Sequence, residues 1–269
     1  MTRTVYWNFF ALCAAFLMAA GVAHAKDDPV LDLVAIGMLE VGPDGSVHDY
    51  TLENDLDPTV AALVDRTVRG WKFEPVVVDG KPVIAVTRMR LELEALPRGD
   101  EYALRVADVL LGAPDRSTRQ PPRYPAAALD EQLSAQVSVL VKVDAEGNVE
   151  AVHVEQVNLS ENLGKRSERF RGYFAEAALE AALRWTFDMG EIIDGEPMPA
   201  TFRVPVGFEM RRANGWSERQ AYVPGPYHPS PWANPGNAAH DIGMLAKGDD
   251  VQPLDSRVKL SEDVVGTLL

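Results

Sequence analysis

Apolar and polar positions along residues 31–96 predict a small unit with the element order strand, strand, helix, strand. The stretch "LVAIGMLEVGPDGSVHDYTLEN" alternates on both sides of a "PDG" turn at residues 43–45, which is typical of a hairpin. Asp57 and Pro58 suit the N-cap and the first position of a helix. In "VVVDGKPVIAVTRMRLELEAL" a second turn precedes a long closing strand. One helical stripe is formed by Val60, Val64, Val68 and Trp71.

The same pattern restarts at residue 135. "AQVSVLVKV" alternates, "DAEGN" is a hairpin loop, and the return strand "VEAVHVEQV" slips at residues 151–152, as a β-bulge would make it. A helix and the closing strand "ATFRVPVGFEM" follow. Gly45 corresponds to Gly147 and Trp71 to Trp185, and each Trp-x-Phe precedes an Asp-Gly-x-Pro. The helix stripe consists of Phe170, Phe174, Ala178, Ala182 and Trp185.

The fold class expected from this repetition is α+β, with two tandem strand-strand-helix-strand domains. Each would be a small antiparallel sheet packed by a helix, with its aromatic residues in the core. We expect domains at 26–97 and 119–211, and a linker at 98–118 with a short helix in "DEYALRVADVLLG". Residues 212–269 form a Pro-rich tail that we expect to be extended or disordered. Its aromatic residues fit a partner-binding segment or a strap over the chain's own domain.

The N-terminus has the pattern of a secretory signal peptide. Arg3 precedes an apolar run from Phe9 to Ala23, and Ala23-His24-Ala25 is a small-x-small cleavage site. The run is shorter than the roughly 20 residues of a spanning helix. We therefore expect residues 1–25 to be removed and the protein to be periplasmic. The alternative is an uncleaved inner-membrane anchor.

Composition narrows the classes of partner and of chemistry. Loss of residues 1–25 removes one of the 26 basic side chains and none of the 40 acidic ones, so the net charge becomes 25 − 40 = −15. Such a chain is repelled by phosphates, and we expect no nucleic-acid partner. Cys13 is the only cysteine and leaves with the signal, so no disulfide is expected. The histidines lack metal-ligand spacing and no nucleotide or hydrolase motif occurs, so no catalytic residue, metal or cofactor is expected.

Residues 119–210 resemble the C-terminal domain of TonB, the periplasmic module that energises outer-membrane receptors. The features that carry the resemblance are Pro122-Arg123-Tyr124-Pro125, Gly147, Trp185-Thr186-Phe187, Asp194-Gly195-Glu196-Pro197 and the strand at 204–208. The first half resembles the same domain more loosely. The resemblance implies partner binding to an outer-membrane receptor or another envelope protein. Energy transduction does not follow, because the motor-docking helix pattern and the long Pro-rich spacer of a full TonB are missing.

Three function classes remain: a periplasmic binding or adaptor protein, a structural or self-associating envelope protein, and an enzyme of unrecognised type. In TonB-like domains the strand after the helix is thought to hold receptor peptides, and Pro205 supports an edge position for it here. The candidate partner-binding residues are therefore Thr201, Arg203 and Val206, with Arg203 suited to an acidic peptide side chain. The competing edge is the long strand "VIAVTRMRLELEAL", which could pair with the second domain or with another chain as a homo-oligomer.

Overall fold

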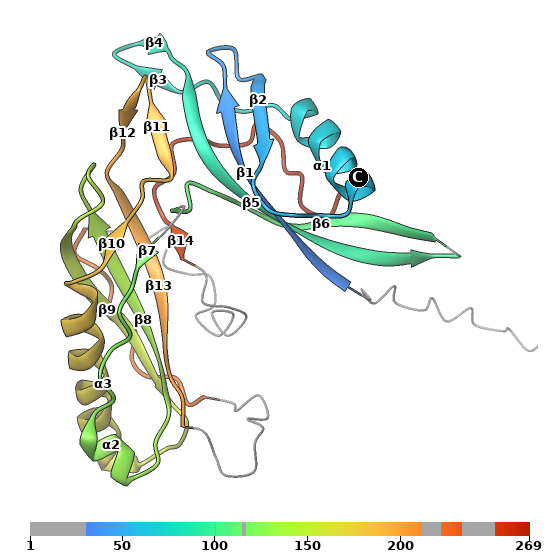
Figure 1. Cartoon of the computed structure of the whole chain (residues 1–269). Helices are drawn as coiled ribbons and strands as arrows, with labels where there is room; N and C mark the ends of the chain where they lie inside the picture. Colours follow the sequence, from blue (N-terminus) through green and yellow to red (C-terminus); the bar gives the residue numbers. More distant parts are fainter. Residues whose placement is uncertain (1–30, 100, 115–116, 211–221, 233–250) are drawn as a thin grey trace, which may run out of the picture.

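The computed structural model of the chain describes residues 31–99, 101–114, 117–210, 222–232 and 251–269 (Figure 1). The expected signal peptide lies outside these described residues. Within them, no helix is long and apolar enough to cross a bilayer. The two larger sheets are antiparallel and each has one long helix beside it, which gives the α+β class that the sequence predicts (Figure 1).

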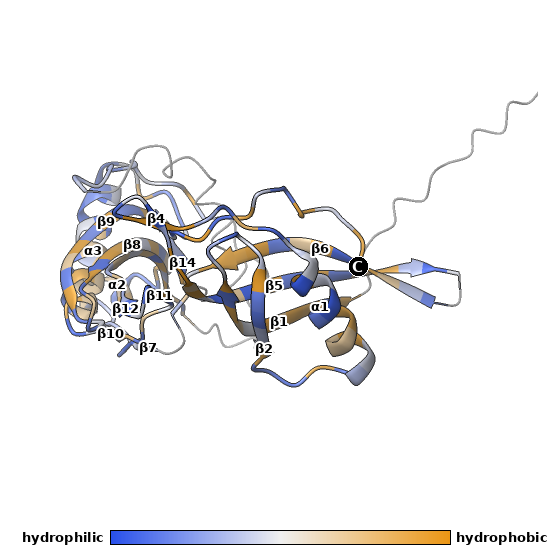
Figure 2. Cartoon of the chain, turned by 90° about the horizontal axis from the view of Figure 1, so that it is seen from above, coloured by the Kyte–Doolittle hydropathy of each residue, from blue (hydrophilic) through white to orange (hydrophobic). Residues whose placement is uncertain are grey.

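The first unit, residues 31–111, is centred on a long strand, β5. Its strands are β1 (Leu31–Val41), β2 (Val47–Leu52), β5 (Ala85–Arg98) and β6 (Glu101–Leu111), and its helix is α1 (Pro58–Gly70). The Asp57 carboxylate accepts a hydrogen bond from the Thr59 N–H at 2.8 Å and so caps α1, as its sequence predicts. β1 pairs with β5 over its whole length, and the hairpin end of β5 and β6 points away from the second unit (Figures 1 and 2).

The second unit, residues 120–210, has the same order of long elements. They are β8 (Ala135–Val143), β9 (Val149–Leu159), α3 (Ser167–Ala182) and β13 (Ala200–Phe208), preceded by the short helix α2 (Ala126–Asp130). A single 3-10 turn, η1 (Gly164–Arg166), leads into α3. β8 lies between β9 and β13, as β1 lies between β2 and β5.

Two Asp-Gly turns make matching hairpins in the two units. Asp79 and Gly80 have φ of 51° and 77°, and Asp194 and Gly195 have φ of 52° and 84°. Two successive residues at positive φ are the signature of a tight hairpin turn. They join β3 (Val77–Val78) to β4 (Lys81–Pro82) and β11 (Glu191–Ile193) to β12 (Glu196–Pro197). The first hairpin stands alone among the described strands, whereas β11 pairs with β5 and extends the first unit's sheet.

The prediction of a short helix between residues 98 and 118 is wrong. Residues 101–111 form the strand β6, which pairs with β5 from Met89 to Arg98. Leu104 and Val106 are buried at a spacing of two, the period of a strand, and the long β5 offers them a partner. Downstream, β7 (Ser117–Thr118) pairs with β10 (Thr186–Phe187) of the second unit.

The expected aromatic and apolar stripes lie in two cores, one in each unit. Along α1, Val64 and Val68 are fully buried and Val60 is partly buried against them. The α3 stripe is buried from Phe170 to Ala182. Trp71 is 9% exposed and Trp185 is 3% exposed, so the prediction that both tryptophans belong to the core is confirmed.

The backbone that follows each helix crosses the hairpin loop of its own unit. The Phe73 N–H donates to the Gly45 carbonyl at 2.9 Å, and the Phe187 N–H donates to the Gly147 carbonyl at 2.9 Å. Both glycines have positive φ, and a Cβ on either would lie within 2.1 Å of the phenylalanine carbonyl oxygen. Only glycine fits such a crossing. The correspondence of Gly45 with Gly147 is therefore visible as the same contact in each unit.

The described parts of the tail are extended segments packed against both units. Val223 forms a bridge with Leu159 at the edge of β9. Residues 251–269 begin with β14 (Gln252–Pro253) on β13 and end beside β6, where the Leu269 N–H donates to the Leu104 carbonyl at 2.9 Å. Val258 and Val264 are buried in the core of the first unit. The tail thus returns across the molecule to the first unit, and the C-terminus lies near α1 (Figure 1).

Candidate functional site

The outer edge of β13 is defined by its pairing with β8. β8 pairs with β13 along its whole length, from Ala200 opposite Val143 to Phe208 opposite Ala135. In an antiparallel ladder the N–H and C=O of one residue point to the same neighbour, and successive residues alternate between neighbours. The Thr201 carbonyl accepts from the Leu254 N–H of the tail at 2.9 Å, so Thr201 points away from β8. The residues of β13 whose backbone groups point to the outer edge are therefore Thr201, Arg203, Pro205 and Gly207.

The tail covers the first part of this edge. β14 pairs with β13 by placing Pro253 opposite Phe202 and Gln252 opposite Arg203. The Thr201 N–H donates to the Asp255 carboxylate at 2.9 Å, which ends the short ladder. From Val204 onward, no strand of the described residues pairs with the outer side of β13. β13 is therefore an edge strand only beyond Arg203, and the edge position that Pro205 suggests does not extend to Phe202 and Arg203.

The Arg203 side chain is bound to a carboxylate of this same chain. Its Nε and Nη2 donate to the two oxygens of Glu155 at 2.7 and 2.9 Å. Arg203 is 4% exposed and Glu155 is 1% exposed. The expected pairing of Arg203 with an acid on a bound peptide therefore has a competitor in Glu155. Removing one partner of such a buried ion pair leaves the other charge buried and unpaired, which is strongly destabilising.

Glu155 reaches Arg203 because β9 carries a bulge there. The register between β8 and β9 shifts so that Ser138 faces Gln156 and Val139 faces Val154, which leaves Glu155 as the extra residue. Its carboxylate also accepts from the Ser138 hydroxyl at 2.9 Å. A second shift leaves out Glu150, so the bulge expected at residues 151–152 occurs one residue earlier. A charged residue within a strand is the sequence signal for Glu155, although the sequence alone does not fix the position of the bulge.

The tail adds a fourth and more exposed member to this network, Tyr227, which is 37% exposed. The Tyr227 hydroxyl donates to Glu155 Oε1 at 3.3 Å. Burial, followed by the charge of Glu155 and this hydrogen bond, raises the pKa of Tyr227 above its ordinary value. The phenol therefore stays protonated at neutral pH and can act as a donor. One of the tail's aromatic residues thus packs on the chain's own domain.

The three predicted partner-binding residues lie on one strand but face different sides of it. Arg203 and Thr201 are two residues apart and share the face that bears Glu155. Val206 is 7% exposed and belongs to the core cluster beneath α3. Its side chain therefore contributes to packing, and its backbone groups point to β8, so neither faces the outer edge. Their role in partner binding remains a prediction.

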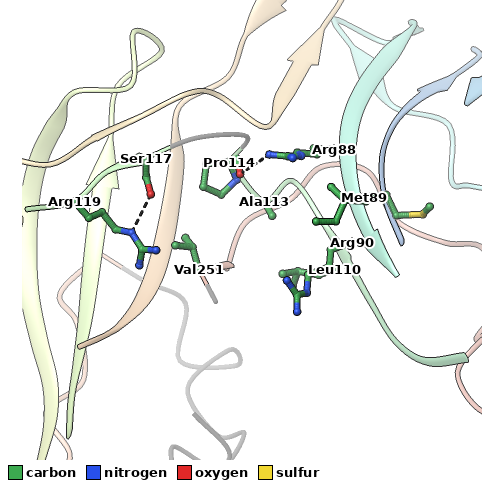
Figure 3. A pocket seen from close by; sticks show the side chains of 10 residues that line it. Arg88, Met89, Arg90, Leu110, Ala113, Pro114, Ser117, Arg119 and Val251 are labelled. Atoms are coloured by element: carbon green, nitrogen blue, oxygen red, sulfur yellow. Dashed lines mark hydrogen bonds between the residues drawn. The ribbon is translucent and has the colours of Figure 1, made fainter. Parts of the chain in front are cut away.

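A cavity of about 200 Å³ lies between the first unit's sheet and the linker (Figure 3). Its polar lining includes Arg88, Arg90 and Arg119. Arg88 donates to the Pro114 carbonyl at 3.1 Å and also pairs with a carboxylate, as does Arg90. Arg88 and Arg90 therefore already have partners within the chain. Among the described residues no cluster of three or more His, Cys, Asp or Glu side chains could hold a metal ion.

Comparison with known proteins finds relatives of the second unit. Residues 120–210 match the family model described as Gram-negative bacterial TonB protein C-terminal. Residues 120–210 are a TonB C-terminal domain. Two curated relatives named Protein TonB, from two strains of Xanthomonas campestris pv. campestris, are each 33% identical to this chain over 90 residues. The matched region is 34% of this chain and 35% of each relative, so this chain corresponds to only part of those proteins. No solved structure matches the chain significantly.

Proposed function

We propose that this chain is a non-enzymatic, TonB-like binding or adaptor protein of the periplasm that acts in transport across the cell envelope. It recognises an extended peptide of an outer-membrane receptor, or of another envelope partner, by adding that peptide as a strand to β13. The single observation that carries this proposal is the outer edge of β13 in a TonB C-terminal domain. Strand addition supplies affinity through main-chain hydrogen bonds and needs no catalytic pocket.

Pro205 supports β13 as the docking edge. It points outward in the alternation that begins at Thr201, so its missing N–H falls on the side away from β8. Proline is tolerated in sheets at such edge positions, where it also limits uncontrolled pairing. An incoming strand would find acceptors along this edge but few donors.

We also propose that the two units are tandem copies, with residues 26–97 as the degenerate one. A shared ion pair supports this. Met38 and Leu140 each lie seven residues before the hairpin glycine (45 − 38 and 147 − 140), and they face Arg88 and Arg203 respectively. The two acids also correspond, because each lies eight residues after that glycine (53 − 45 and 155 − 147). Arg88 pairs with Glu53 at 3.0 Å, as Arg203 pairs with Glu155.

The periplasmic location is tested at the N-terminus. Mass spectrometry of the protein from its native cells should give a mature chain that begins at Lys26. A membrane-embedded form that retains Met1 would instead support the inner-membrane anchor and would reopen the question of a motor contact.

Site-specific photo-crosslinking tests the binding edge. Gly207 is exposed on the outer side of β13, and a Cβ there would have no atom within 4 Å, so it can be replaced by a photoreactive amino acid. Gly172 in α3 is equally open and serves as the matched control on a different element. Irradiation in native cells should give a covalent product with an outer-membrane receptor from position 207 and none from position 172.

The products distinguish the candidate functions. A receptor attached at 207 supports the adaptor. A product that contains only a second copy of this chain would support the structural, self-associating protein. The same product from both positions, or none from 207, would contradict binding at the β13 edge.

A further inference from the structure

The tail covers the very backbone donors that an incoming strand needs. The outward donors of β13 are the N–H groups of Thr201, Arg203 and Gly207, because Pro205 has none. The Thr201 N–H is taken by Asp255, and Arg203 lies opposite Gln252. A strand that added only beyond Arg203 would meet Pro205 first. A partner must therefore compete with β14 for the edge at Thr201–Arg203.

The sequence of β14 suits this edge. Pro253 lies opposite Phe202, whose backbone groups point to β8. No hydrogen bond to β13 is therefore lost because proline lacks an N–H. Gln252 lies opposite the outward-pointing Arg203, where an N–H is needed. Two residues after the proline, the Asp255 carboxylate accepts from Thr201. The segment thus satisfies the edge with one short pattern, Gln-Pro-x-Asp.

The residues that follow β14 hold it close to the edge. The Ser256 hydroxyl and the Arg257 N–H both donate to the buried Glu191. Val258 is 1% exposed in the core of the first unit. These anchors do not depend on the β13 ladder. If β14 leaves the edge, it stays tethered nearby at an effective concentration on the order of millimolar.

We propose that β14 is an internal competitor which occupies the peptide-binding edge in the resting chain, and that a partner binds by displacing residues 251–255. The partner peptide resembles the segment that it replaces: it is extended, accepts a proline opposite Phe202, and carries an acid that caps the Thr201 N–H. This inference rests on the proposed function, since it specifies the occupancy and the ligand chemistry of the same edge.

Peptide binding to the full chain tests this. The probe is a fluorescent peptide of residues 250–257, DVQPLDSR. Gln252→Pro removes the N–H that faces Arg203 and opens the edge, whereas Gln252→Ala keeps the N–H and is the matched control. The probe should bind Gln252→Pro at least about tenfold more tightly than the wild type, because the tethered competitor is weakened. Gln252→Ala should stay close to the wild type.

The ligand chemistry is tested by the probe itself. A peptide with alanine in place of the residue that corresponds to Asp255 should bind the opened variant about tenfold more weakly, since the Thr201 N–H loses its acceptor. Equal binding of the two peptides would overturn the acidic requirement.

Two results separate this proposal from the proposed function. Measurable and equal binding of the probe to wild type and Gln252→Pro would overturn the internal competitor and leave strand addition intact. Binding to neither would overturn strand addition at this edge, and the competitor with it.

A reversible lock avoids dependence on the proline variant. Thr201→Cys with Leu254→Cys joins β13 to the tail where the Leu254 N–H already meets the Thr201 carbonyl, in a background in which Cys13 is replaced by serine. The oxidised chain should bind the probe at least about tenfold more weakly than the same chain after reduction. Equal binding in the two states would show that the tail does not block the edge.

Discussion

The two units differ most where their closing strands meet their outer neighbours. β5 is covered along its length: β11 pairs with Ala85–Thr87, the Arg88 N–H donates to the Gly190 carbonyl at 2.9 Å, and β6 covers Met89–Arg98. β13 has only the short β14 on its outer side among the described residues. The long first-unit strand considered as a competing edge therefore pairs with the second unit and with β6. Among the described residues, the closing strand of the first unit is thus paired along its length, and that of the second unit is partly accessible.

The side-chain exposure of the matching arginines, Arg88 and Arg203, shows the opposite trend. Arg88 and Glu53 form a partly exposed pair, with 13% and 31% of their side-chain surface accessible. Arg203 and Glu155 are at 5% and 2%. In the second unit the ion pair on the face of the sheet is buried while the backbone edge is only partly covered, and in the first unit the edge is the better covered. The recognition that we propose at β13 would therefore use the backbone edge, since the buried ion pair is already satisfied.

The two tryptophans give the largest expected effects on stability. Trp185→Ala should lower the free energy of unfolding by about 3–5 kcal/mol, as for large aromatic truncations in cores. Trp71→Ala should cost less within this range, because Trp71 is more exposed and Trp185 also donates its Nε1–H to the Gln120 carbonyl at 3.0 Å. Urea denaturation measures both. Loss of partner binding without loss of stability in Trp185→Ala would instead assign this residue to the interface.

Removing the acid of each ion pair tests the contrast in burial. Glu155→Ala should cost about 3–5 kcal/mol, because it leaves the Arg203 guanidinium buried without its carboxylate. Glu53→Ala should cost about 1 kcal/mol or less, because its pair is partly solvated. The measurement is again urea denaturation of the full chain. Equal losses would mean that solvent exposure does not separate the two pairs.

Local patterns in the sequence were sufficient for much of the fold. The aromatic stripe of α3 and the Asp-Gly turns depend on neighbours within a few residues, and both are confirmed. β6 was missed because "EYALRV" contains good helix formers, and its strand conformation depends on the remote partner β5. Propensity gives way to tertiary context in such a segment.

The candidate site was only partly predictable for the same reason. The sequence indicates an edge strand through Pro205, a property of one residue. It does not indicate which segment lies beside that strand, because β14 is about fifty residues away and its pairing depends on few side chains. The partner of Arg203 depends on a bulge in β9, and one sequence does not fix the position of such an irregularity.

Amide hydrogen exchange should distinguish the two closing strands directly. The Arg203 amide is protected only as long as the short β14 stays in place, so it can exchange by local opening. The Arg88 amide lies within a covered edge and should exchange through larger opening events. We expect exchange at Arg203 to be at least about 100-fold faster, which corresponds to about 2.7 kcal/mol. Similar rates at the two arginines would contradict the picture of a partly accessible β13.

The smallest expected effect concerns Tyr50, which has no tyrosine counterpart in the second unit. By the count from the hairpin glycines, its position corresponds to Val152 in the second unit (50 − 45 and 152 − 147). Tyr50 is 3% exposed, and its hydroxyl has no hydrogen-bond partner among the described residues. Tyr50→Phe should therefore raise the free energy of unfolding by about 1 kcal/mol at pH 7, since it removes a buried hydroxyl that forms no hydrogen bond.

The same residue predicts a loss of stability in alkali that is specific to the first unit. Burial, followed by the charges of Asp65 and Glu53, raises the pKa of Tyr50 from its ordinary 10.0 to about 12. Between these two values the unfolded chain releases the phenolic proton and the folded chain keeps it, so stability falls as the pH rises. Thermal melts between pH 9 and pH 11.5 of wild type and Tyr50→Phe should diverge, with the phenylalanine variant losing less. Tyr102→Phe, at a residue that is 66% exposed, is the control and should follow the wild type. Parallel curves for all three chains would show that Tyr50 titrates normally and is not buried in the first unit's core.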